Sequence, residues 1–353
     1  MRKGKRLVAW IMAVVMLFTI CVFGGNGTAE AAAATPVAKH GRLSVKGADL
    51  VDSKGNKFQL RGISTHGINW DVGSPYVNKK AFKTLRDDWG VNAIRLAMYT
   101  EEYNGYCSGG SQAKLRKLVD KGVGYATDLG MYAIIDWHIL SDGNPNKNKS
   151  QAKKFFTTMA KKYKNNKNVI YEICNEPNGC SWKEIKSYAT DIIKTIRKYD
   201  KKAVIIVGTP TWSQLGTDGT SNEVADSPIK GYKNIMYSLH FYASEWAHNE
   251  YLPAKVAYAR KKKLPILVSE FGLSPASGDG AINKASADKW MKLLNKYNIS
   301  YFCWSLSNKN ESASLLKPST KKTFGWKSGD LSTAGKYIKK KYLARKKALG
   351  KKA

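Results

Sequence analysis

Strand-like and helix-like stretches alternate along most of this 353-residue chain, and this alternation limits the possible folds more than any other feature. Eight short runs are rich in Val, Ile, Leu and aromatic residues without strict polar alternation, which is typical of parallel strands buried on both faces. These runs are residues 58–64, 91–97, 131–138, 168–174, 203–208, 235–241, 265–271 and 300–305. Amphipathic helical stretches lie between them at residues 79–89, 112–129, 151–163, 182–197, 252–262 and 282–297, and a last helix is expected from about residue 332.

Eight successive β–α units predict an α/β fold, a single-domain (β/α)8 (TIM) barrel. A doubly wound sheet is the alternative. Such sheets usually have a Gly-rich first turn, whereas the first strand here continues into Gly62-Ile63-Ser64-Thr65-His66-Gly67. A short N-terminal β-hairpin is expected before the barrel, from residues 42–51 and 57–63 around a turn at 52–56. The connection after the fifth strand looks least regular.

The N-terminus has the parts of an export signal. A basic start precedes an apolar run at residues 7–23, and Ala29-Glu30-Ala31 matches a cleavage site. An uncleaved anchor is disfavoured because the apolar run is short for a membrane span. We therefore expect a secreted, extracellular monomer without membrane contact after cleavage. The predicted parts are a signal peptide at 1–31, a short linker at 32–41, the barrel domain at 42–340 and a basic C-terminal tail at 341–353.

The net charge of +32 raises the question of a polyanionic partner. Residues 335–353 alone contain nine Lys or Arg and no acidic residue. The chain has no nucleic-acid-binding motif, so a nucleic-acid partner is not expected. A solvated lysine face on the last helix, with Ile338 and Tyr342 turned inward, explains the pattern more simply. Weak adhesion of this segment to polyanions or cell-wall polymers is a third interpretation.

Four cysteines follow the predicted signal peptide, and their pairing does not follow from the sequence. Cys107 and Cys180 fall in polar loops and could form a disulfide bond. Cys174 and Cys303 lie in strand-like runs, where cysteine usually behaves as a small buried apolar residue. We favour four free thiols.

Two carboxylates stand at the C-terminal ends of predicted strands, where core packing does not explain them. Glu176 follows the fourth strand and Glu270 ends the seventh, and because burying an unpaired charge is costly, a shared role is indicated. In a barrel these strand ends meet at one rim, which is where active sites lie. Further polar and aromatic residues are predicted at this rim: His66, Trp70, Arg95, Tyr99, His138, Asn175, Trp212, His240, Tyr242, Trp304, Lys309 and Glu311.

Paired carboxylates among aromatic side chains suit glycoside hydrolysis, because aromatic rings stack on sugar rings while the carboxyl groups do the chemistry. The alternative is a metal held by His66, His138 or His240. These histidines belong to the first, third and sixth strands and need not converge. The chain also lacks a phosphate loop and a nucleophile elbow. We therefore expect chemistry without a metal or other cofactor.

Six motifs occur in order along the chain: Arg95-Leu96, Asp136-Trp137-His138, Ile173-Cys174-Asn175-Glu176-Pro177, His240-Phe241-Tyr242, Ser269-Glu270-Phe271-Gly272 and Trp304-Ser305-Leu306. In content and spacing they resemble glycoside hydrolase family 5 of clan A, and most of all its bacterial endo-β-1,4-glucanases (cellulases). The resemblance covers residues 40–340 and implies a retaining enzyme that hydrolyses internal bonds of β-1,4-glucan.

The resemblance also implies a role for each residue of the rim. Glu176 would be the proton donor and base, and Glu270 the nucleophile. Arg95 and Tyr242 would support Glu270, His240 would support Glu176, and Asn175 would bind the sugar 2-hydroxyl. The remaining residues would bind substrate: His66, Trp70, Tyr99, His138, Trp212, Trp304, Lys309 and Glu311.

The sequence defines the substrate less closely than it defines the mechanism. Endo-β-1,4-mannanases and mixed-linkage glucanases of the same fold share both glutamates, and the Trp304-Ser305-Leu306 region favours glucose units by resemblance. A non-catalytic basic polysaccharide-binding protein is a further alternative. The presence of both Glu176 and Glu270 argues against it, because a binding protein needs neither.

Overall fold

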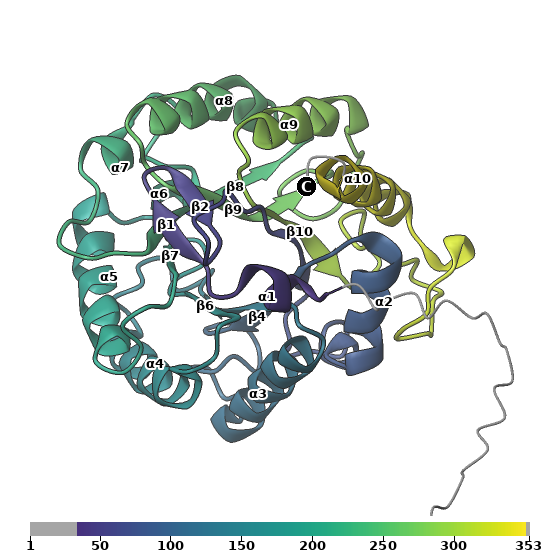
Figure 1. Ribbon diagram of the computed structural model, residues 1–353, viewed down its shortest axis with the longest axis horizontal. Coiled ribbons are helices and arrows are strands. Elements are labelled where there is room, and N and C mark those ends of the chain that lie inside the picture. Colours follow the sequence, from purple (N-terminus) through teal and green to yellow (C-terminus); the bar gives the residue numbers. More distant parts are fainter. Residues whose placement is uncertain (1–33, 351–353) are drawn as a thin grey trace, which may run out of the picture. The chain divides into compact units, whose positions relative to one another are not determined.

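The computed structural model describes residues 34–350, and the predicted signal peptide and the last three residues lie outside this range. Eight parallel strands close into a barrel in chain order, with the last strand next to the first (Figure 1). They are β3 (Arg61–Thr65), β4 (Ala93–Tyr99), β5 (Tyr132–His138), β6 (Val169–Glu172), β7 (Ile205–Val207), β8 (Ile235–Tyr242), β9 (Ile266–Gly272) and β10 (Tyr301–Leu306). Every residue of these strands is buried, as their apolar composition predicts. The predicted (β/α)8 barrel is confirmed.

Helices surround the barrel and bury one apolar face each against it. They are α2 (Lys79–Trp89), α3 (Gln112–Asp128), α4 (Lys149–Tyr163), α5 (Trp182–Arg197), α8 (Trp246–Lys261), α9 (Lys284–Lys296) and α10 (Thr333–Gly350). Local sequence signals explain where they begin. The Asn78 side chain caps α2 by accepting from the Ala81 amide, and Ser181 with Glu184 forms a capping box at α5.

Two connections between barrel strands depart from the regular pattern or from the predicted helix positions. The one after β7 holds only the short helices α6 (Pro210–Ser213) and α7 (Glu223–Asp226), in line with its irregular sequence. Helix α8 begins at Trp246, six residues before the predicted start at residue 252. The prediction was wrong there because Pro253 marks a first turn in most helices, whereas here it lies inside α8.

The N-terminal hairpin is also displaced from its predicted position. It pairs β1 (Ser44–Lys46) with β2 (Asp49–Val51), so its turn falls at Gly47, whose φ of 59° suits glycine. The turn predicted at residues 52–56 is present, but the residues on its two sides pair through an isolated bridge between Val51 and Lys57 and not as two strands. The expected linker contains a short helix, α1 (Pro36–His40).

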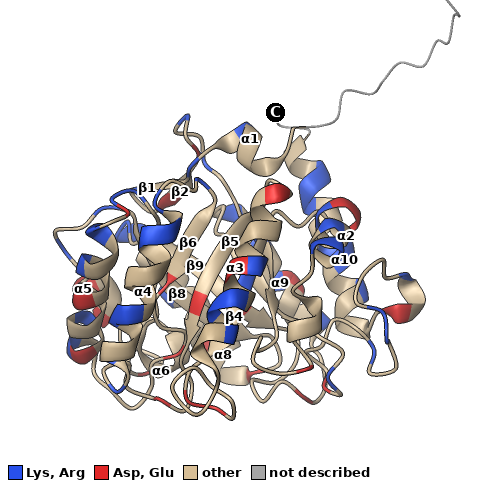
Figure 2. Cartoon of the chain, turned by 90° about the horizontal axis from the view of Figure 1, so that it is seen from below, with Lys and Arg blue, Asp and Glu red and all other residues tan. Residues whose placement is uncertain are grey.

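The hairpin closes the N-terminal end of the barrel. Leu43, Leu50 and Phe58 pack against inward-facing strand residues such as Ile134 and Phe302. Figures 1 and 2 show α1 and the hairpin across this end, while the C-terminal ends of the strands face the opposite way. The open rim that remains is the one that carries the predicted polar residues.

Helix α10 completes the barrel. Ile338 and Tyr342 are fully buried, as predicted, and the Tyr342 hydroxyl donates to the Gly62 carbonyl of β3 at 2.8 Å. The helix continues through Gly350, so residues 341–350 of the predicted tail are helical. Among residues 34–350, no helix is both long and apolar enough to cross a membrane.

The four cysteines of the barrel are free thiols. Cys174 and Cys303 are buried in strands or directly after them, as expected, while Cys107 and Cys180 are half-buried in connections.

Candidate active site

A cleft of about 570 Å³ lies at the C-terminal rim of the barrel. Both glutamates line it, together with ten other predicted residues: His66, Trp70, Tyr99, His138, Trp212, His240, Tyr242, Trp304, Lys309 and Glu311. Arg95 and Asn175 are buried directly beneath its floor. Sequence reasoning did not identify further lining residues, among them Glu102, Gln214, Glu245 and His248.

Glu176 and Glu270 face each other across this cleft. One carboxylate oxygen of each, together with a ring nitrogen of His240, lies within a set of atoms no more than 4.8 Å apart. Glu270 accepts a hydrogen bond from the Tyr242 hydroxyl at 2.8 Å and one from Arg95 Nη1 at 3.0 Å. Among the described residues, the one side chain within hydrogen-bonding distance of the Glu176 carboxyl group is His240, whose Nδ1 is 2.8 Å from Glu176 Oε1. The two carboxyl groups therefore have different electrostatic surroundings.

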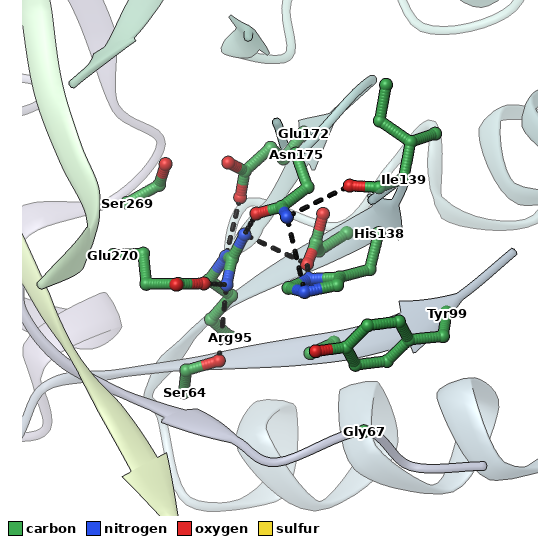
Figure 3. Close-up of polar contacts among 12 residues, drawn as sticks. Ser64, Gly67, Arg95, Tyr99, His138, Ile139, Glu172, Asn175, Ser269 and Glu270 are labelled. Atoms are coloured by element: carbon green, nitrogen blue, oxygen red, sulfur yellow. Dashed lines mark hydrogen bonds and ion pairs between the residues drawn. The ribbon is translucent and has the colours of Figure 1, made fainter. Parts of the chain in front are cut away.

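Arg95 is the centre of a buried ionic network (Figure 3). Its guanidinium contacts Glu172 at 2.7 Å, Asp136 at 3.0 Å and Glu270 at 3.0 Å. Burial alone would disfavour the positive charge, but these three carboxylates outweigh it and raise the pKa of Arg95. A permanent positive charge is thus held under Glu270.

Sequence reasoning missed Asp136 and Glu172 as partners of Arg95. The signal was present, because both are charged residues inside strand runs that are otherwise apolar. Such a residue in a buried strand must find an opposite charge or lose its own.

Burial raises the pKa of Glu176 to about 8, and Asp136 and Glu172 add to the shift while Arg95 opposes it. Glu176 therefore holds a proton at neutral pH. Glu270 differs, because a guanidinium and a phenol hydroxyl both stabilise its negative charge. One carboxyl group is set up to donate a proton and the other to act as an anion.

The two histidines of the floor are neutral. Burial lowers the pKa of His240 to about 4 and lowers that of His138 as well. His138 Nδ1 is held by Asp136, so its Nε2 accepts from the Asn175 amide at 3.2 Å. His240 Nε2 lies 2.9 Å from Ser269 Oγ. Each ring is thus fixed at both nitrogens.

The Asn175 amide is oriented from both ends. Its oxygen accepts from Arg95 Nη2 at 2.5 Å, and its nitrogen donates to His138 Nε2 and to the Ile139 carbonyl at 3.1 Å. These contacts fix which end of the amide is the donor. Both hydrogens of the amide nitrogen are donated to these two acceptors beneath the floor of the cleft.

Aromatic rings cover one side of the cleft. Trp304 is stacked with His138, with ring centroids 5.3 Å apart and an interplanar angle of 19°, and Trp70 lies 4.5 Å from Tyr99. Gly67 permits this packing, because a Cβ there would lie 2.6 Å from Trp70 and 2.7 Å from Tyr99. The rings form an apolar wall next to Glu270.

The outer predicted residues divide between two ends of the cleft. Lys309 pairs with Glu311 at 2.5 Å, and Glu311 lies 3.7 Å from His66, all on the side of Trp304. Trp212 lies after β7 and is 43% exposed. Its backbone has a φ of 53°, an uncommon conformation for tryptophan, and the hydrogen bond that its amide donates to the Pro177 carbonyl helps to hold this conformation.

Glu176, His240 and Glu270 are close enough to be tested as a metal site. Both oxygens of Glu270 already have donors, and the Arg95 guanidinium lies 3.0 Å away, where it would repel a cation. The donor set thus fits a metal ion poorly.

The sequence profile described as "Cellulase (glycosyl hydrolase family 5)" matches residues 51–310. The chain belongs to this family. Its members are glycoside hydrolases, which accords with the paired carboxyl groups and the aromatic wall of the cleft.

Relatives within family 5 resemble the chain over most of its length. An endoglucanase of Clostridium saccharobutylicum is 47% identical over 341 residues, covering 95% of this chain and 72% of that protein. Endoglucanase 5 of Pectobacterium carotovorum subsp. carotovorum is 45% identical over 325 residues, 92% of this chain and 62% of that protein. The chain therefore spans only part of these relatives.

Solved family 5 structures share the barrel. The catalytic domain of the Thermobifida fusca endoglucanase Cel5A (E5) has a TM-score of 0.81 and 37% identity, covering 88% of this chain and 100% of the domain. A variant of that domain was solved in complex with cellotetraose, with a TM-score of 0.80 and 36% identity. The match covers 88% of this chain.

Proposed function

We propose that the chain is an exported, retaining endo-β-1,4-glucanase that hydrolyses internal bonds of cellulose or a related β-glucan. The observation that carries the proposal is the spacing of the two carboxyl groups, whose oxygens approach within 4.8 Å. Retaining glycosidases hold these groups about 5–5.5 Å apart, whereas inverting enzymes need about 6.5–9.5 Å to admit a water molecule.

In the first step, Glu270 attacks the anomeric carbon and forms a glycosyl–enzyme bond, while the glycosidic C–O bond breaks. Glu176 gives its proton to the leaving oxygen, which is why its raised pKa matters. Arg95 and Tyr242 hold Glu270 in line for attack through their two hydrogen bonds.

In the second step, Glu176 is ionised and takes a proton from a water molecule that attacks the same carbon. The bond to Glu270 breaks, and the departing carboxylate regains its hydrogen bonds to Arg95 and Tyr242. Two inversions at one carbon leave its configuration unchanged. Asn175 stabilises both transition states by donating to the sugar 2-hydroxyl.

Similarity supports the choice of β-glucan. The relatives named above are endoglucanases, and a variant of the Thermobifida fusca domain was solved with cellotetraose. Initial rates on carboxymethyl-cellulose, barley β-glucan and galactomannan test the choice. Turnover confined to galactomannan would make the enzyme a mannanase instead.

The roles of the two glutamates can be separated with azide and an activated aryl cellobioside. Glu270→Ala should lower turnover by at least about 1,000-fold, and azide should then yield the α-glycosyl azide. Glu176→Ala should still cleave the activated bond, and azide should yield the β-glycosyl azide from the covalent intermediate.

The configuration of each azide product, measured by NMR, gives the assignment. Exchanged products between the two variants would reverse the two roles. Inverted configuration in the wild-type product would exclude the double displacement.

A further inference from the structure

Two aromatic side chains outside the cleft are exposed and in contact with each other. Trp246 is 68% exposed and Tyr251 is 37% exposed, and their ring centroids lie 5.8 Å apart at 83°. Exposed aromatic side chains that form a contiguous patch, unlike single exposed ones, point to a binding surface. We call the pair the Trp246–Tyr251 surface.

This surface is continuous with the cleft. Trp246 follows Glu245 directly and precedes His248 by two residues, and both of these residues line the cleft, so Trp246 lies at the cleft's edge. His248 Nδ1 accepts from the Tyr242 amide at 2.9 Å, and Tyr242 in turn holds Glu270. The start of α8 is thereby fixed relative to the proposed nucleophile.

The connection after β7 supports the same surface from below. It carries Trp212 and Gln214 in the cleft and Gly219 beneath Tyr251, where a Cβ would lie 2.8 Å from the ring. Buried Lys255 of α8 braces this connection by donating to the carbonyls of Gln214 and Asp218. The cleft and the Trp246–Tyr251 surface are therefore parts of one rigid unit.

The position of the surface defines which part of a glucan it would meet. Trp304, His66 and Lys309 line the cleft from the β10 and β3 connections, and Trp212 lines it from the β7 connection. Glu270, the proposed nucleophile, attacks the sugar before the scissile bond, so this sugar lies at the Trp304 wall and the leaving part of the chain runs past Trp212 toward α8. The reducing-end segment of a long glucan would then reach Trp246.

We propose that Trp246 and Tyr251 bind the reducing-end side of long β-1,4-glucan chains beyond Trp212. This inference rests on the proposed function. Because the two rings are nearly perpendicular, one sugar stacks on the Trp246 face while Tyr251 supports the indole from its edge. The ligand is an uncharged polymer of equatorially linked glucose units whose apolar faces match an indole.

The test compares substrates of increasing length in wild type, Trp246→Ala and Trp246→Tyr. Trp246→Ala should raise KM on barley β-glucan and carboxymethyl-cellulose by about 3- to 10-fold, which corresponds to the binding free energy of one aromatic stacking contact. The kcat/KM on an aryl cellobioside should stay within about twofold, because that substrate ends near the scissile bond. Trp246→Tyr should recover most of the loss on polymer.

Phe324→Ala is the matched control, because Phe324 is also an exposed aromatic (44%) but does not line the cleft. Thermal melting should be unchanged in all three variants, since the side chains are exposed. Equal losses on polymer and aryl cellobioside, or unchanged KM on every substrate, would overturn the inference. A wild-type enzyme without activity on any β-glucan would instead overturn the proposed function, so the two failures are distinct.

Discussion

At the scale of single residues, Arg95 makes the two glutamates of the cleft different. It donates to Glu270 at 3.0 Å but has no hydrogen bond to Glu176, whose one partner in the described structure is a neutral histidine. A cation stabilises a carboxylate in direct contact far more than one a few ångströms away in a partly solvated cleft. The pair thus divides into an anion and an acid.

The raised pKa of Glu176 sets the alkaline limb of the pH profile. The proposed acid must be protonated, so kcat/KM on barley β-glucan should fall as pH rises through about 8. A profile measured from pH 4 to 10 at substrate concentrations well below KM gives this value directly.

The control is Glu176→Ala acting on an activated aryl cellobioside, whose leaving group needs no acid. Its glycosylation rate should lose the alkaline limb near pH 8. An unchanged limb in this variant would assign the titration to another group and contradict the role of Glu176.

At the scale of elements, α10 contributes to the core despite its basic sequence. Tyr342 is fully buried and bonded to the Gly62 carbonyl, whereas the next residue, Leu343, is 37% exposed. Deleting residues 335–353 to remove the lysines would therefore also remove Ile338 and Tyr342 from the core. Substitutions are the cleaner way to test the basic segment.

Tyr342 should matter for stability in two separable ways. Tyr342→Phe removes the hydrogen bond and should cost about 1 kcal/mol of unfolding free energy, and Tyr342→Ala should cost about 3–5 kcal/mol through the cavity it leaves. Leu343→Ala is the neighbouring control and should cost less than about 0.5 kcal/mol. Chemical denaturation measures all three; a neutral Tyr342→Ala would mean that α10 is not needed to close the barrel.

Element positions also show how far sequence reasoning extends. All eight strands were predicted to within three residues at each end, and the helices α2 and α5 to the residue, because apolar runs and capping residues are local signals. The hairpin turn and the start of α8 were not. The sequence offers two possible turns, at Gly47 and at residues 52–56, and Pro253 is a residue type that often marks the first turn of a helix. In both cases tertiary contacts decide between two local signals.

At the scale of the whole molecule, charge is separated by region. Among the described residues that line the cleft, five are glutamates (Glu102, Glu176, Glu245, Glu270 and Glu311), and Lys309 is the one Lys or Arg. Lys and Arg instead lie mainly on the surrounding helices, as Figure 2 shows. The chain has a net charge of +32, and its excess positive charge thus lies outside the cleft that is proposed to bind an uncharged substrate.

This separation predicts that adhesion to polyanions is independent of catalysis. Substituting Gln for the exposed Lys336, Lys340 and Lys347 of α10 should lower the salt concentration that elutes the enzyme from a sulfated or phosphorylated polymer. Activity on β-glucan should be unchanged. The same number of substitutions on α4, at Lys153, Lys154 and Lys161, is the control for total charge. Equal effects from both sets would mean that net charge, and not α10, governs retention.

The assembly of the cleft was predictable to a similar degree. Strand-end residues followed from the barrel, since parallel strands deliver their C-terminal ends to one rim. The partners of Arg95 and the surface at Trp246 depend on which side chains meet across the barrel and how α8 is braced. Neither is encoded in the spacing of one segment.

The contact between Tyr342 and Gly62 spans 280 residues of sequence. The first barrel strand, β3, precedes its neighbour β10 and the helix that covers them by the length of almost the whole barrel. Without them the first strand has an open edge that can pair with another chain. Until β10 and α10 are in place, this edge exposes the folding chain to aggregation.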